Sequence, residues 1–203
     1  FKNLKQDLKK EGIVFLSIED LSKDQLLYLE QHFDQEIFPV LTPIAIDANR
    51  PFPLLANKSM NIAVSLIDKK EKVAFQKKLP IVQIPRRINR FVELPIENEI
   101  KCYVLLEEAI SYFINKLFTG LSVNSLTMFR ITRNADLEFD EEDSQDLLVE
   151  IEKELKKRKW GAPVRLEVSN NYLDIDIFDY LINELEIREM ADTYIINGPI
   201  DLT

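Results

Sequence analysis

The sequence predicts an α+β fold with a mixed, largely antiparallel β-sheet and amphipathic helices packed mainly on one face of that sheet. Three observations support this prediction. Short runs rich in Val, Ile and Phe cluster between residues 61 and 106. Several longer stretches repeat apolar residues at spacings of three and four, as helices do. Beyond residue 120, strand-like and helix-like stretches alternate.

The chain opens with a helix and a strand. Leu4 and Leu8 stand at helical spacing in a lysine-rich stretch that ends at Gly12, a residue typical of helix C-terminal turns. We expect this helix to begin upstream of residue 1. The run "IVFLS" at 13–17 then predicts a buried strand.

The second helix is predicted from a capping box. Ser22 is followed three residues later by Gln25, and the apolar positions continue as Leu26, Leu29, Phe33 and Ile37. The helix should end before Pro39, because proline cannot continue it. His32 lies at the margin of the apolar stripe, so we interpret it as a partly buried helix residue rather than a general acid or base.

The middle of the chain predicts a loop and then a β-meander. Residues 38–61 hold four prolines, which prevent regular helix, and enough apolar residues to hold an ordered loop against the body. Five runs then predict successive strands: "NIAVSLI" (61–67), "VAFQKKL" (73–79), "IVQIP" (81–85), "RFVELP" (90–95) and "IKCYVLL" (100–106).

The remaining stretches predict alternating elements. Helices are expected at 106–119, 141–159 and 177–185, and strands at 123–134, 163–168 and 193–198. The helix at 141–159 has acidic residues at its start and basic residues at its end, which the helix macrodipole explains without a ligand.

Two arginines stand close together in "FRITRNADLEFDEED" at 129–143. Side chains alternate along a strand, so Arg130 and Arg133 can grip one anion only if a bulge or the strand end falls between them. Arg133 is expected to reach past the rim of the core toward a carboxylate, with Asp136 or a residue of 140–143 as partner. A role in organising the loop is favoured, and a phosphate contact or a subunit contact stays open.

A second basic group, "PRRINR", supplies Arg86, Arg87 and Arg90 near a strand boundary. The planar fork of arginine suits phosphate oxygens, although arginines in a turn are more often simply solvated. Together with Arg130 and Arg133, these three are the candidates for binding a polyanion.

The composition and the absence of known catalytic motifs exclude several classes of function. The net charge of −9 opposes a protein that wraps a polyanion over its whole surface, and nucleic acid is a poor partner for the same reason. One cysteine and one histidine are too few for an internal disulfide or a zinc site, and no apolar run is long enough to cross a bilayer. No phosphate-binding loop, dinucleotide-binding motif or nucleophile elbow occurs. The residues alone therefore predict a soluble, non-catalytic domain of a reducing compartment.

A set of segments occurs in a specific order: "FPVLTPIAIDANRPFPLLANKSMNIAV", "QIPRRINRFVELP", "YVLLEEAISYFINKLFTG", "FRITRNADLEFDEED", "PVRLEV" and "YIINGPIDLT". This set resembles the middle, or head, domain of the large bacterial polyphosphate kinase family. The resemblance covers the chain from about Gly12 to Thr203.

The resemblance implies an enzyme that moves the γ-phosphate of ATP reversibly onto polyphosphate through a phosphohistidine, with Mg. Residues 1–11 should end a helical N-terminal domain, and residues 12–203 should form the middle domain. The family's catalytic, metal-binding and nucleotide-binding positions belong to other domains of the same polypeptide, so no catalytic residue, metal ligand or cofactor is expected in this chain. The resemblance further implies a homo-oligomer in the cytoplasm, with peripheral association at the inner membrane as an alternative.

Three functions stay open at this stage. The leading hypothesis is a structural and dimer-forming domain without chemistry of its own. The second is a path for polyphosphate lined by the candidate arginines. The third, should the family assignment fail, is a generic protein-interaction module.

Overall fold

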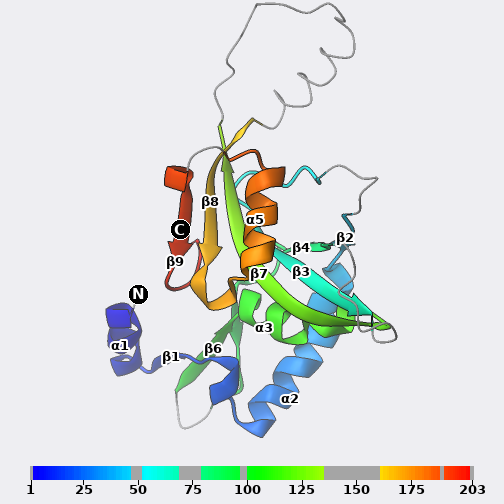
Figure 1. Ribbon diagram of the computed structural model, residues 1–203. Helices are drawn as coiled ribbons and strands as arrows, with labels where there is room; N and C mark the ends of the chain where they lie inside the picture. Colours follow the sequence, from blue (N-terminus) through cyan, green and yellow to red (C-terminus); the bar gives the residue numbers. More distant parts are fainter. Residues whose placement is uncertain are drawn as a thin grey trace, which may run out of the picture.

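The computed structural model describes residues 2–46, 52–68, 79–96, 100–134, 161–187 and 190–201. Their strands form a six-stranded sheet in the order β2-β4-β3-β7-β8-β9 and a three-stranded sheet in the order β1-β6-β5 (Figure 1). The predicted α+β class with mostly antiparallel pairing is confirmed. The strands of the protein form two separate sheets. The larger sheet contains β2 (Pro43–Ile44), β3 (Met60–Asp68), β4 (Ile81–Gln83), β7 (Leu121–Arg133), β8 (Pro163–Ser169) and β9 (Thr193–Ile196). The smaller sheet contains β1 (Ile13–Phe15), β5 (Phe91–Glu93) and β6 (Lys101–Leu105).

The predicted single meander breaks after β4. The Ile84 amide still donates to the Met60 carbonyl of β3 at 2.9 Å, but Pro85 follows and has no amide to continue the pairing. The chain then turns away, and β5 pairs with β6 instead. β1 adds to the other side of β6 in parallel. The predicted strand at 73–79 lies outside the described residues except for Leu79, which is not in a strand.

The described helices are α1 (Lys2–Lys10), α2 (Lys23–His32), α3 (Leu106–Phe113) and α5 (Ile175–Glu184). The starts of α2, α3 and α5 lie close to where the sequence predicts them, and α3 passes into a 3-10 turn at Ile114–Leu117 before the predicted end at residue 119. The expected start of the first helix upstream of residue 1 lies outside the described residues. The capping box of α2 is present, because the Ser22 hydroxyl accepts from the Gln25 amide at 3.2 Å and the Gln25 side chain accepts from the Ser22 amide at 3.1 Å. None of the described helices combines the length and apolarity needed to cross a membrane. The predicted helix at 141–159 lies outside the described residues.

Two segments differ in detail from the prediction. After His32 the second helix widens into a π-helical turn at Phe33–Ile37, followed by a 3-10 turn at Phe38–Val40 that accommodates Pro39. The proline-rich loop contributes the short strand β2, which pairs with β4 at the edge of the larger sheet. An edge position tolerates Pro43, since one side of the strand needs no hydrogen bonds.

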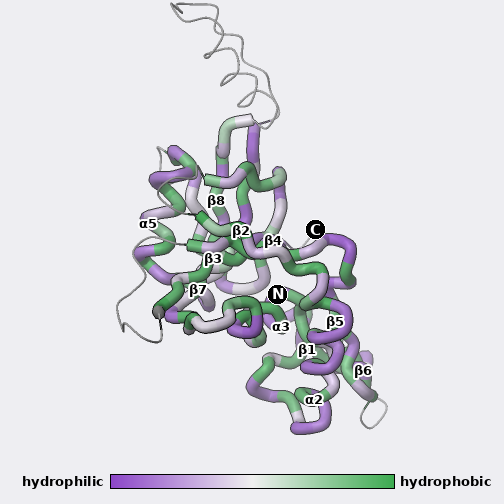
Figure 2. Tube along the Cα trace, turned by 90° about the vertical axis from the view of Figure 1, so that its right-hand side faces the viewer, coloured by the Kyte–Doolittle hydropathy of each residue, from purple (hydrophilic) through white to green (hydrophobic). Residues whose placement is uncertain are grey.

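The larger sheet carries a hydrophobic core on each face. Ile62, Val64 and Met128 belong to the core shared with α2 and α3. Phe129 and Ile131 belong to the core shared with α5. Helices therefore cover both faces rather than mainly one, because β3 and β7 place apolar residues on both sides. In Figures 1 and 2, α3 lies between the two sheets and α5 lies on the opposite face of the larger one.

A close backbone approach joins the end of β7 to the start of β8. The Asn134 amide donates to the Ala162 carbonyl at 2.8 Å, next to a register shift between Thr132 and Arg133. Gly161 has φ +67° there, and a Cβ on it would lie 1.8 Å from the Asn134 carbonyl oxygen. Glycine is therefore required at this position both by conformation and by space.

We predict that Gly161→Ala destabilises the fold by at least about 2 kcal/mol, because it adds a backbone clash to a left-handed conformation. Gly120→Ala is the matched control, since Gly120 has φ +83° but open space around the position of a Cβ. It should cost only about 1 kcal/mol. Urea denaturation measures both, and equal losses would contradict the steric argument.

Candidate functional site

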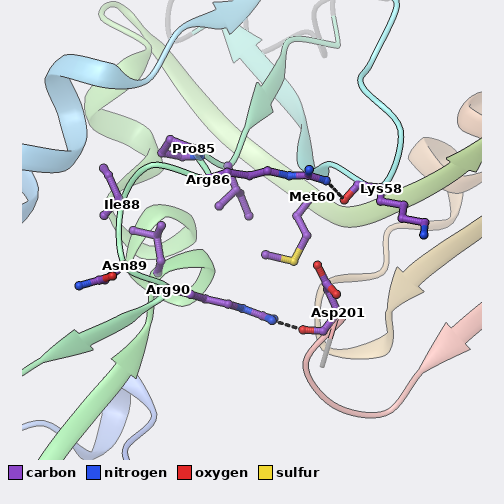
Figure 3. Close-up of a pocket in the computed structure, with 10 residues that line it drawn as sticks. Lys58, Met60, Pro85, Arg86, Ile88, Asn89, Arg90 and Asp201 are labelled. Carbon is purple, nitrogen blue, oxygen red and sulfur yellow. Dashed lines mark hydrogen bonds between the residues drawn. The ribbon is translucent and has the colours of Figure 1, made fainter. Parts of the chain in front are cut away.

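Two of the candidate arginines line one cleft of about 340 Å³ (Figure 3). We call it the arginine cleft, and its lining is Lys58, Met60, Ile84, Pro85, Arg86, Ile88, Asn89, Arg90, Leu106 and Asp201. Lys58 comes from the turn before β3, Arg86 and Arg90 from the segment between β4 and β5, and Asp201 from the segment after β9. Sequence positions far apart thus meet at the place where the two sheets join.

Arg90, which is partly buried, forms an ion pair with the buried Glu107. Its Nε lies 3.0 and 3.1 Å from the two carboxylate oxygens, and its Nη2 lies 2.5 Å from Oε1. The Glu107 side chain is only 2% exposed. Arg90 also donates to the carbonyl oxygens of Ile200 and Asp201. Four of the five N–H donors of a guanidinium are consequently used within the protein.

Arg130 reaches the same region from β7. Its Nη1 lies 3.4 Å from a Glu167 carboxylate oxygen, and its Nη2 lies 3.4 Å from an Asp201 carboxylate oxygen. Glu167 is also held by Arg165, at 3.1 Å, whose guanidinium lies 4.1 Å from the centre of the Tyr194 ring. Arg130 is therefore engaged with carboxylates of the fold.

Arg133 lies apart from the arginine cleft. Its Nε donates to the Leu55 carbonyl at 3.1 Å and its Nη1 to the Gly161 carbonyl at 3.0 Å. Burial lowers the pKa of this guanidinium from its ordinary value. Arg130 and Arg133 hence do not converge, even though a register shift falls between Thr132 and Arg133. The carboxylates predicted as partners of Arg133, at Asp136 and 140–143, lie outside the described residues.

Arg86 and Arg87 are the exposed members of the candidate set. The Arg86 Nη2 donates to the carbonyls of Asn57 and Lys58, at 3.2 and 2.6 Å. Among the described residues no carboxylate pairs with Arg86 or Lys58 at the arginine cleft. The positive charge that is available to an outside anion therefore lies at Arg86, Arg87 and Lys58. Lys58 has no distinguishing pattern in the sequence, and only the fold identifies it.

The single histidine lies in α2. The His32 ring is 21% exposed, stacks on Tyr28 with centroids 6.2 Å apart, and places Nδ1 3.7 Å from a Glu36 carboxylate oxygen. The predicted partly buried helix histidine is confirmed. In the part of the chain that the structure describes, no group of three or more His, Cys, Asp and Glu residues could hold a metal ion.

A second cleft, of about 430 Å³, has the opposite electrostatic character. We call it the acidic cleft, and its lining is Ser17, Ile18, Glu19, Glu108, Ser111, Tyr112, Asn171 and Tyr172. Sequence reasoning missed it, because its residues come from three distant segments. The only local signal was the pair of glutamates that open α3, which the helix macrodipole also explains.

Comparison with known proteins identifies relatives over the whole chain. Residues 24–203 match the family model described as the polyphosphate kinase middle domain. A polyphosphate kinase of Bacillus cereus is 53% identical over 97% of this chain, and one of Exiguobacterium sibiricum is 46% identical over all of it. The chain spans 28% of the length of each of these two relatives.

A solved structure supports the fold. The crystal structure of polyphosphate kinase from Porphyromonas gingivalis matches 98% of this chain with a TM-score of 0.74 and 20% sequence identity, over 28% of that chain.

The contacts of Arg90 generate a prediction about stability. Arg90→Ala should cost about 3–5 kcal/mol of unfolding free energy, because it leaves the buried Glu107 charge without a partner. Arg86→Ala is the matched control and should cost less than about 1 kcal/mol, since Arg86 is exposed. Urea denaturation of both variants measures the two losses in unfolding free energy. The double variant Arg90→Met/Glu107→Leu should recover most of the loss, and a loss as large as that of Arg90→Ala would argue against the ion-pair explanation.

Proposed function

Because this chain belongs to the polyphosphate kinase family and matches its middle domain, we propose that it is the structural and dimer-forming domain of an enzyme that transfers the ATP γ-phosphate to polyphosphate. In this proposal the transfer is reversible, passes through a phosphohistidine and uses Mg. ATP, Mg and the reacting histidine are held by other domains of the same polypeptide. The generic interaction module is set aside, since it depended on failure of the family assignment.

The contacts of the buried charged side chains are the main support for this proposal. Glu107, Glu167 and Arg133 are each largely buried, and their described contacts are to other parts of the fold. A catalytic centre instead keeps titratable groups directed at a place where substrate binds. The contact of His32 with Glu36 on one face of a helix likewise supports a structural role.

Exposed apolar side chains support the dimer-forming part of the proposal. Leu27 and Tyr28 on α2, with Phe38 and Val40 in the turn that follows, are large apolar residues exposed to solvent. A contiguous apolar surface is typical of protein contacts, and in this proposal these four residues contribute to such a contact. We assign residues 1–11 to the end of the preceding helical domain and residues 12–203 to the middle domain, in a cytoplasmic enzyme.

The 203-residue chain incubated with ATP, Mg and polyphosphate should show no phosphate transfer in either direction, as followed by ATP production and by polymer length. In sedimentation it should self-associate, and Leu27→Glu should weaken that association. Glu11→Gln, which alters an exposed residue next to α1, is the control. Turnover by the chain alone would disprove the non-catalytic role.

A polyphosphate-binding role is the second candidate, and one observation favours it. Arg86, Arg87 and Lys58 hold positive charge near the arginine cleft that no described carboxylate neutralises. In contrast, Arg90 uses four of its five donors within the fold, Arg130 contacts the carboxylates of Glu167 and Asp201, and Arg133 donates to two backbone carbonyls. A short track of positive charge suits a linear polyanion even on an acidic protein.

In the whole enzyme, Arg86→Ala/Arg87→Ala should therefore weaken polyphosphate binding several-fold at low salt and reduce the dependence on salt by about one unit of slope per lost contact. Fluorescence anisotropy at several salt concentrations measures this. Lys9→Ala/Lys23→Ala removes the same charge from exposed positions on α1 and α2 and is the control. Equal weakening in both variants would mean a general charge effect and no defined track.

A further inference from the structure

Asp201 places a negative charge in the positive arginine cleft. It is the only acidic residue among the described residues that line this cleft, and Figure 3 shows its side chain pointing into it. Its Oδ1 lies 3.4 Å from the Nη2 of Arg130. Met60, which also lines the cleft, lies directly opposite Arg130 in the pairing of β3 with β7. The Asp201 carboxylate therefore lies where the cleft meets Arg130.

The contacts that Arg130 makes to carboxylates are long. Its distances to Glu167 and to Asp201 are both 3.4 Å. Charged hydrogen bonds between a guanidinium and a carboxylate or phosphate are usually about 2.7–2.9 Å long. Arg130 can thus make closer contacts to an anion than those it makes to Asp201. The Asp201 carboxylate accordingly occupies a position that suits an oxygen of an anionic ligand.

The backbone of the cleft is held in an uncommon conformation at two charged residues. Lys58 has φ +59° and Asp201 has φ +64°, in the left-handed region that residues other than glycine seldom adopt. The Arg86 Nη2 donates to the Lys58 carbonyl at 2.6 Å, and Arg90 donates to the Asp201 carbonyl. Two of the three described non-glycine residues with positive φ therefore line this one cleft. Residues of this kind are concentrated at sites that bind ligands.

We propose that Asp201 is a specificity-determining residue of the arginine cleft, whose carboxylate excludes short phosphates and so favours long polyphosphate. This inference rests on the polyphosphate-binding role proposed above. A short anion such as tripolyphosphate has few charges and needs contacts to several walls of the cleft at once, where Asp201 repels it. A long chain gains contacts along the exposed side chains of Arg86 and Arg87 and can leave the space next to Asp201 empty.

The test compares the affinities of tripolyphosphate and of long-chain polyphosphate for the 203-residue chain by calorimetry. Shifts of the backbone amides of Lys58, Arg86 and Asn89 in the ¹⁵N-labelled chain report binding at the cleft. Asp201→Asn should strengthen the binding of tripolyphosphate by about 10-fold and that of the long chain by less than about 3-fold. Asparagine adopts left-handed φ readily, so the backbone is preserved. Asp201→Gly also tolerates this φ and should give the same result, which separates the loss of charge from any effect of the asparagine side chain.

Glu93→Gln is the matched control, because it removes the same charge from an exposed position on β5. It should leave the ratio of the two affinities unchanged. An equal change in the ratio for Glu93→Gln and Asp201→Asn would mean a general charge effect and would overturn the proposal. Long-chain binding without any change of the ratio in the Asp201 variants would overturn the role of Asp201 alone and leave the polyphosphate-binding role intact. Absence of binding of both phosphates to every variant would overturn both.

Discussion

The buried charge of Glu107 constrains much of this fold. A carboxylate that is 2% exposed needs a cation, and Arg90 is the described residue that supplies it. The same arginine binds the carbonyls of Ile200 and Asp201, while its own carbonyl accepts from the Leu106 amide at 2.7 Å. One ion pair thereby joins the start of β5, the first turn of α3 and the segment after β9. The two sheets meet at this point.

Local patterns predicted most elements, because helix caps, apolar spacing and glycine act over a few residues. The Ser22 capping box and the strand at 123–134 illustrate this success. The division into two sheets was not predictable in the same way, since it depends on the parallel pairing of β1 with β6, which lie far apart in the chain. Pro85 marks the break, but a proline alone does not reveal where the next strand pairs.

The candidate site was predictable only in part. The arginine pairs were visible in the sequence. Arg130 and Arg133 contact different parts of the fold, although a register shift between Thr132 and Arg133 interrupts the regular alternation between them. Which arginines are held by the fold and which remain available depends on partners such as Glu107 and Asp201, which are distant in sequence. Both clefts also border α3: Leu106 lines the positive one and Glu108 lines the negative one. Two nearby residues at the start of one helix thus line two clefts of opposite charge.

The two cores of the larger sheet share β3 and β7 as a common wall. A disturbance that loosens α5 removes packing from one face of these strands and so weakens the support for α2 and α3 on the other face. The two layers should consequently unfold cooperatively, as one thermodynamic unit, rather than as separate modules. Amide protons in the centre of β3 and β7 should then exchange with solvent last, because they are released only when both layers open.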